Sequence, residues 1–107
     1  MDSLDKIQVG SSWLNINSLT GVSTGSEIAI QNIGANVGAS QKIGTPDAVI
    51  EVTTNSSEPS PEFTGWHITQ GEMWVVSSGS PSVWCKFSSL GDVDVGDHIC
   101  NIKVQEL

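Results

Sequence analysis

The amino-acid sequence predicts an all-β fold, a single-domain antiparallel β-sandwich or jelly roll of about eight short strands. Apolar and polar residues alternate with a period of two along most of the chain. Residues that favour turns separate the alternating segments about every 8 to 12 positions, as in sandwiches, jelly rolls and small barrels. No apolar stripe with helical spacing is long enough for a helix of normal length. A chain of 107 residues is too short for two independent cores, so residues 1–107 are expected to form one domain.

Each alternating segment predicts one strand. Short turns are expected between the first segments, and the glycine-punctuated stretch that follows residue 33 predicts a bulge or an edge position. In chain order, the predicted strands are residues 5–10, 12–16, 27–33, 47–53, 65–69, 72–78, 82–88 and 97–105, with turns at 18–21 and 23–26.

Alternation also assigns side chains to the two faces of a strand. In the 82–88 strand the better core face leaves Trp84 pointing outward beside Lys86. In the 72–78 strand both faces are apolar, which predicts that this strand is covered on both sides. The sets that share one face are Ile28, Ile30 and Asn32; Ala48, Ile50 and Val52; and Val83, Cys85 and Phe87.

Residues 55–63 interrupt the strand pattern. They contain two prolines and no apolar residue before Phe63, which is the composition of a loop. We expect this loop to be the most mobile internal segment, because surface connections pack less than the strands they join.

The charge of the chain argues against polyanionic partners. Twelve acidic residues stand against four basic ones, all lysine, and the net charge is -8. Such a chain repels phosphate backbones and anionic lipid, so neither nucleic acid nor a membrane is an expected partner. No apolar run approaches the roughly 18 residues of a spanning helix, and the first residues show no secretory signal.

The two cysteines, Cys85 and Cys100, both lie in apolar alternating segments. Free cysteine is among the most buried residue types, so two buried thiols are the favoured interpretation. A disulfide and a metal role remain the alternatives.

Metal sites are weakly indicated. Asp92 and Asp94 share one strand face, and Asp97 begins a turn. A calcium-binding EF-hand loop needs an oxygen ligand at its fifth position and glycine at its sixth, whereas Gly96 and Asp97 occupy these positions here. A solvated hairpin edge is therefore favoured over a weak Ca²⁺ site. The residue types that zinc prefers are present without the usual close spacing of ligand pairs, so no metal site is predicted. Those residues are His67, Cys85, His98 and Cys100.

Catalysis is not expected. The chain has no nucleophile elbow, phosphate-binding glycine loop or dinucleotide fingerprint, and a paired-carboxylate glycosidase usually needs a larger domain. We therefore predict a protein without catalytic residues or cofactors.

The tryptophans carry more information, because they are four of only six aromatic residues. An outward Trp84 has three interpretations: it packs under a loop, it contacts another protein, or it forms a platform on which a sugar ring stacks. The third interpretation makes a small carbohydrate-binding module an alternative function.

The order of these sequence features resembles small virion structural proteins of tailed bacteriophages. The similarity consists of a tryptophan strand, a glycine turn, a strand that ends in an Asn-containing turn, a glycine-led strand, a Gly/Ser/Pro hairpin, a V-W-x-K strand and a closing apolar strand. Its elements are Trp13, Gly21, Gly25, and residues 28–32, 71–77, 78–81, 83–86 and 101–107.

The resemblance implies a non-enzymatic protein that decorates and stabilises the capsid by binding the major capsid protein. It implies a virion location on the capsid surface, assembly in the host cytoplasm and homo-oligomers on the shell. A tail or fibre-base component is the alternative within the same family. The apolar side chains of two strands and of the two ends are the candidate interaction residues. They are Trp84, Trp74, Leu4, Ile7, Val104 and Leu107.

Overall fold

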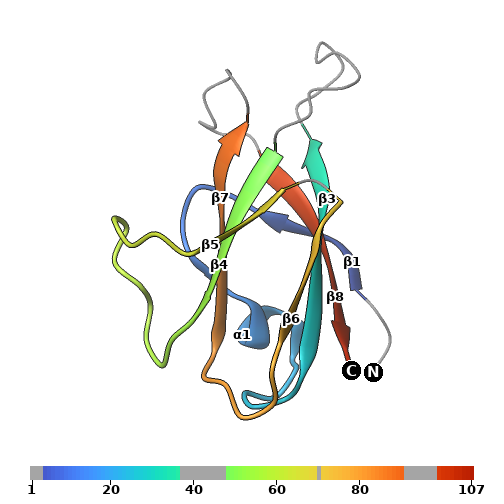
Figure 1. Cartoon of the computed structure of the whole chain (residues 1–107), viewed down its shortest axis with the longest axis vertical. Coiled ribbons are helices and arrows are strands. Elements are labelled where there is room, and N and C mark those ends of the chain that lie inside the picture. Colours follow the sequence, from blue (N-terminus) through green and yellow to red (C-terminus); the bar gives the residue numbers. More distant parts are fainter. Residues whose placement is uncertain (1–3, 37–47, 70, 91–98) are drawn as a thin grey trace.

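The computed structural model describes residues 4–36, 48–69, 71–90 and 99–107. Eight strands and one short helix make up this part of the chain (Figure 1). The elements are β1 (Leu4–Val9), β2 (Leu14–Asn15), α1 (Ile16–Thr20), β3 (Ile28–Asn36), β4 (Ala48–Thr54), β5 (Trp66–Thr69), β6 (Met73–Val76), β7 (Val83–Leu90) and β8 (Ile99–Glu106).

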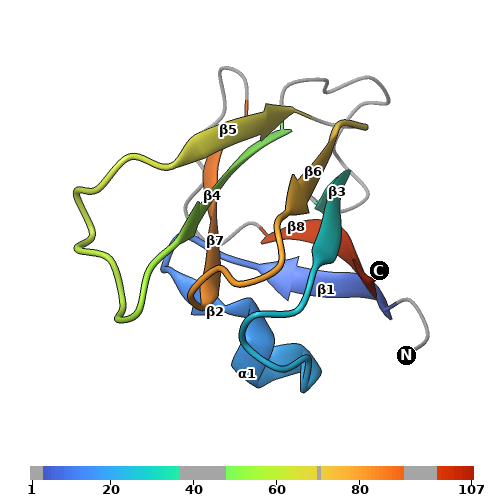
Figure 2. The ribbon, with the colours of Figure 1, turned by 60° about the horizontal axis from the view of Figure 1, so that its bottom comes forward.

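The strands form two four-stranded antiparallel sheets, which confirms the predicted all-β sandwich. Sheet A has the order β1-β8-β3-β6 and sheet B the order β2-β7-β4-β5. The first strand pairs with the last, the second with the seventh, the third with the sixth and the fourth with the fifth. This nested pairing is the connectivity of a jelly roll. Figure 2 shows the two sheets facing each other, with α1 below one end of the sandwich.

The core lies between the sheets and follows the predicted alternation. All nine residues of the three face sets are buried, and eight of them join one hydrophobic cluster with residues of β1 and β8. The ninth, Asn32, is a polar residue with no exposed surface. Its side-chain amide donates to the backbone oxygens of Ala48 (2.7 Å) and Ile68 (2.9 Å), and its oxygen accepts from the thiol of Cys100 (3.1 Å). Asn32 therefore links sheet A to sheet B through the middle of the core.

The helix α1 replaces the end of one predicted strand and a predicted turn. Asn15 caps its first turn by accepting a hydrogen bond from the Ser18 amide (3.1 Å). Gly21 ends it with φ 80, and the Gly21 amide donates to the Asn17 oxygen. Five residues are too few to produce an apolar stripe in the sequence, which is why periodicity missed this helix.

The expectation that β6 is covered on both sides is wrong. Trp74 is partly buried against the core and Val76 is buried, but Met73 is 63% exposed and Val75 is 44% exposed. β6 lies at the edge of sheet A, so its outer side chains face solvent in the described structure. The helix α1, with five residues, is far too short to cross a membrane, and the described residues hold no longer helix.

Candidate interaction surfaces

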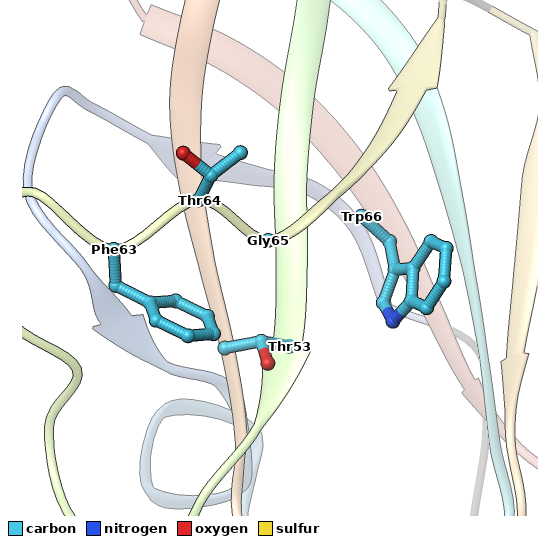
Figure 3. Close-up of a pocket in the computed structure, with 5 residues that line it drawn as sticks. All are labelled: Thr53, Phe63, Thr64, Gly65 and Trp66. Carbon is cyan, nitrogen blue, oxygen red and sulfur yellow. The ribbon is translucent and has the colours of Figure 1, made fainter.

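Two surfaces expose large apolar side chains where the fold does not use them. The first is a notch at the edge of sheet B, where β5 begins at Trp66, so that within the described structure the last residues of β4 have no strand partner on that side. Trp66 is 69% exposed and Phe63 is 47% exposed. Figure 3 shows the Thr53 side chain between these two aromatic residues, with the chain passing above it through Thr64 and Gly65. Together these five residues line a cavity of about 270 Å³, which we call the Trp66 notch.

The loop that carries Phe63 is fastened to the outer face of sheet B by Trp13. The Trp13 indole nitrogen donates to the backbone oxygen of Ser60 (3.1 Å), and the indole ring lies 6.3 Å from the Phe63 ring at an interplanar angle of 51°. The Lys86 ammonium lies over the Trp13 ring at 4.9 Å and donates to the Pro61 oxygen (3.0 Å). The predicted loop is therefore present, and these contacts attach it to sheet B; its mobility relative to other segments stays a prediction.

Gly65 completes this attachment beside the notch. Its amide donates to the buried carboxylate of Glu51 (2.8 Å), which thereby acquires a partner on the outer face of β4. A Cβ atom on Gly65 would lie 2.8 Å from the Val52 oxygen and 3.1 Å from the Trp13 ring. The backbone is packed so closely here that only glycine fits without displacement.

The second surface is the outer face of sheet A. The register places side chains of β3, β6 and β8 on this face, and a shallow hollow of about 90 Å³ lies among them. Ile33, exposed at the bulge in β3, adjoins them. We call this surface the Met73 face; its residues are Ala29, Gln31, Ile33, Met73, Val75, Lys103 and Gln105.

The Met73 face differs in charge from the chain as a whole. Lys103 is the one charged member among its seven residues, although the protein carries a net charge of -8. Glu72 precedes Met73, but its carboxylate turns back to accept hydrogen bonds from the hydroxyl and amide of Thr69. These two bonds lower the pKa of Glu72.

Neither of the two predicted tryptophans lies on an open surface. Trp84 points away from the core, as alternation predicts, but it is only partly exposed and its indole donates to the Asn55 oxygen (3.0 Å). Trp84 therefore packs beside the start of the 55–63 loop. Trp74 faces inward on β6, while its neighbours Met73 and Val75 face outward.

The other four predicted interaction residues do not form one surface. Ile7 is partly buried against the core and lines an open cavity next to α1, while Leu107 is exposed at the end of the chain. Leu4 pairs with Val104 in the β1–β8 ladder, and its side chain lies outside the described structure. Val104 faces inward on β8 and is buried in the core. It therefore cannot contact a partner.

Both cysteines are buried free thiols, as predicted. Burial raises the pKa of Cys85, with a smaller contribution from the nearby Cys100. Burial also raises the pKa of Cys100, to about 11. Both thiols are therefore protonated at neutral pH and are poor nucleophiles and poor metal ligands.

The remaining metal-site expectations find no support within the described part of the chain. His67 is exposed on β5 whereas Cys85 and Cys100 are buried, and no group of three metal-ligating side chains occurs among the residues that the structure describes. Asp92, Asp94, Asp97 and His98 lie outside the described residues, so the turn and calcium interpretations of that stretch stay predictions.

Trp66, Phe63 and Met73 are not among the interaction residues that the sequence predicts. Trp66 stands opposite Val52 and two positions from Ile68, and both of these are buried, so alternation would place Trp66 in the core. It is exposed because it is the first residue of a short edge strand. The sequence feature that could have indicated this surface is Phe63, an aromatic residue at the end of a polar loop.

Comparison with known proteins found no matching family model, no matching curated protein and no matching solved structure.

Proposed function

We propose that this protein is a non-enzymatic virion structural protein of a tailed bacteriophage, which decorates and stabilises the capsid by binding the major capsid protein through the Met73 face. The observation that carries the proposal is a sheet face on a strongly acidic chain that exposes Ile33, Met73 and Val75 and has one charged residue among its seven. The order of sequence features that resembles such virion proteins, and a jelly-roll fold of a kind used in viral capsids, support it.

The chemistry of the Met73 face suits a protein contact. The centres of protein interfaces are depleted of charged residues and enriched in methionine and aromatic side chains. Among its seven residues the face carries one ammonium group and no carboxylate, and the long side chain of Lys103 can keep that ammonium in water while the apolar side chains are buried.

A strand edge adjoins the same face. Among the residues that the structure describes, β6 pairs with β3 on one side and ends sheet A on the other, so this edge can accept a strand from a partner. A modest contact for each copy is sufficient on a shell, because many copies bind side by side and can contact each other. Such neighbouring copies are the homo-oligomers that the proposal includes.

A matched pair of charge substitutions tests the docking surface. Met73→Lys should weaken binding to undecorated capsids at least tenfold, equivalent to about 1.4 kcal/mol, because it places a solvated charge at the centre of the contact. Leu19→Lys makes the same change on the exposed side chain of α1, near β1 at the opposite edge of sheet A. It should bind as the unchanged protein does.

The readout is the amount of protein that pellets with capsids over a range of concentrations, after urea unfolding has shown equal stability of both variants. Equal binding by Met73→Lys and the unchanged protein would exclude this face. Saturable binding to isolated tails, and none to capsids, would favour the tail or fibre-base alternative.

A further inference from the structure

We propose that the Trp66 notch is a binding site for a neutral carbohydrate, separate from the Met73 face and independent of capsid decoration. The site lies on sheet B, whereas the proposed docking face lies on sheet A. Two aromatic rings are exposed there, contacts with Trp13 hold the loop that carries one of them, and none of the lining residues is charged.

The exposure of Trp66 has no structural purpose that the described contacts reveal. At 69% exposed, its side chain is the most exposed large apolar one in the described part of the chain, and it is not a member of the core cluster. Phe63 on the other side of Thr53 is 47% exposed, although its ring also approaches Trp13 (Figure 3). Two aromatic residues thus present free ring surface at the rim of one cavity.

Contacts within the protein hold the backbone of the notch in place. Phe63 is placed by the contacts of Trp13 with the 55–63 loop, and the backbone of Trp66 is placed by its pairing with Val52 and by the bond from Gly65 to Glu51. The close packing of Gly65 against Val52 and Trp13 connects these two supports. A ligand that enters such a site does not have to order the loop, which reduces the entropic cost of binding.

The lining chemistry selects the ligand class. Thr53 and Thr64 bring hydroxyl groups that both donate and accept hydrogen bonds, and none of the five lining residues is charged. An aromatic ring has a negative face, which attracts the slightly positive C–H groups on one side of a sugar ring. A pyranose has such a C–H face together with hydroxyls at its edge, and so it matches both kinds of lining group.

The size and charge of the site narrow the choice. A cavity of about 270 Å³ is just below the range of about 300–1,000 Å³ for drug-sized ligands, so it suits one or two sugar rings of a chain that continues into solvent. An anionic ligand would find no cation in the lining and would meet a protein of net charge -8. The ligand is therefore a neutral glycan.

The test is a titration of the full chain with maltohexaose, cellohexaose and the hexamer of N-acetylglucosamine. Tryptophan fluorescence and the indole N–H signal of Trp66 in a ¹⁵N–¹H spectrum report binding at this site. We expect a saturable change with at least one of the three sugars, and a loss of affinity of at least tenfold in Trp66→Ala. Leu19→Ala, which truncates another exposed apolar side chain, should bind as before.

Trp66→Ala should keep the urea midpoint of the unchanged protein, because Trp66 lies outside the core cluster. It should also keep its capsid binding, whereas Met73→Lys should keep its sugar binding, so the two proposals fail separately. No saturable change with any of the three sugars would overturn the carbohydrate site, and so would equal affinity in Trp66→Ala. Displacement of the sugar by tetramethylammonium at equal concentration would also overturn it, because the notch would then be a cation site.

Discussion

Replacement of Asn32 by alanine should remove a buried polar link between the two sheets. Asn32 has no exposed surface, and its side chain makes three hydrogen bonds, two to sheet B and one to the thiol of Cys100 in sheet A. Each such bond contributes about 1 kcal/mol net, and truncation also leaves a cavity in the core. We expect Asn32→Ala to lower the free energy of unfolding by about 3–5 kcal/mol, out of the roughly 5–15 kcal/mol of a domain this size.

Urea unfolding followed by tryptophan fluorescence measures this loss. With a slope of about 2 kcal/mol per molar urea, the midpoint should fall by about 1.5–2.5 M. Gln31→Ala is the matched control, because Gln31 is the next residue on β3 and its amide makes one exposed bond to the Gly71 oxygen (3.2 Å). That control should lose about 0.5 kcal/mol or less. A loss below about 1 kcal/mol for Asn32→Ala, or one no larger than the control's, would refute the cross-sheet role.

The remaining predictions concern the thiols and the glycine beside the notch. Burial raises the pKa of Cys100 from 9.0 to about 11 and also raises the pKa of Cys85. Because the unfolded chain therefore loses these protons at lower pH than the folded protein does, the free energy of unfolding should fall as pH rises from 9 to 11. The fall is at most about 1.4 kcal/mol per pH unit for each thiol. Urea unfolding of Cys100→Ala across this range should show a smaller fall. An identical fall in the variant would contradict the contribution of the Cys100 thiol. Gly65→Ala should destabilise the protein by about 1–3 kcal/mol, because its Cβ would meet the Val52 oxygen at 2.8 Å. Gly10→Ala, where the Cβ meets nothing within 4 Å, should change the urea midpoint little, and equal effects of the two substitutions would disprove the close packing.

The period-two pattern predicted the sheets well, because a strand buried on one face must alternate. The inward positions of Ile28, Ile30 and Asn32 on β3 follow directly from that pattern. The hydrogen bonds of Asn32 do not follow from it, since they join residues 16, 36 and 68 positions apart. Pairing across the sandwich is a property of the folded chain that local alternation does not encode.

The candidate surfaces were harder to predict, because exposure depends on where each sheet ends. Trp84 has the outward position that alternation assigns, but the loop that begins at Asn55 partly covers it. Trp66 has an inward position and is exposed because β5 is a short edge strand. Trp74 lies on the same strand as the proposed docking surface but faces inward, whereas Met73 and Val75 are exposed on the outer face.

The number of protein copies that sediment with undecorated capsids, with isolated tails as the control, is the direct measure of capsid decoration. We expect saturable binding at a copy number that matches the repeated subunits of the shell, with no comparable binding to tails. Binding to tails alone at a few copies per particle, or binding to neither particle, would contradict it.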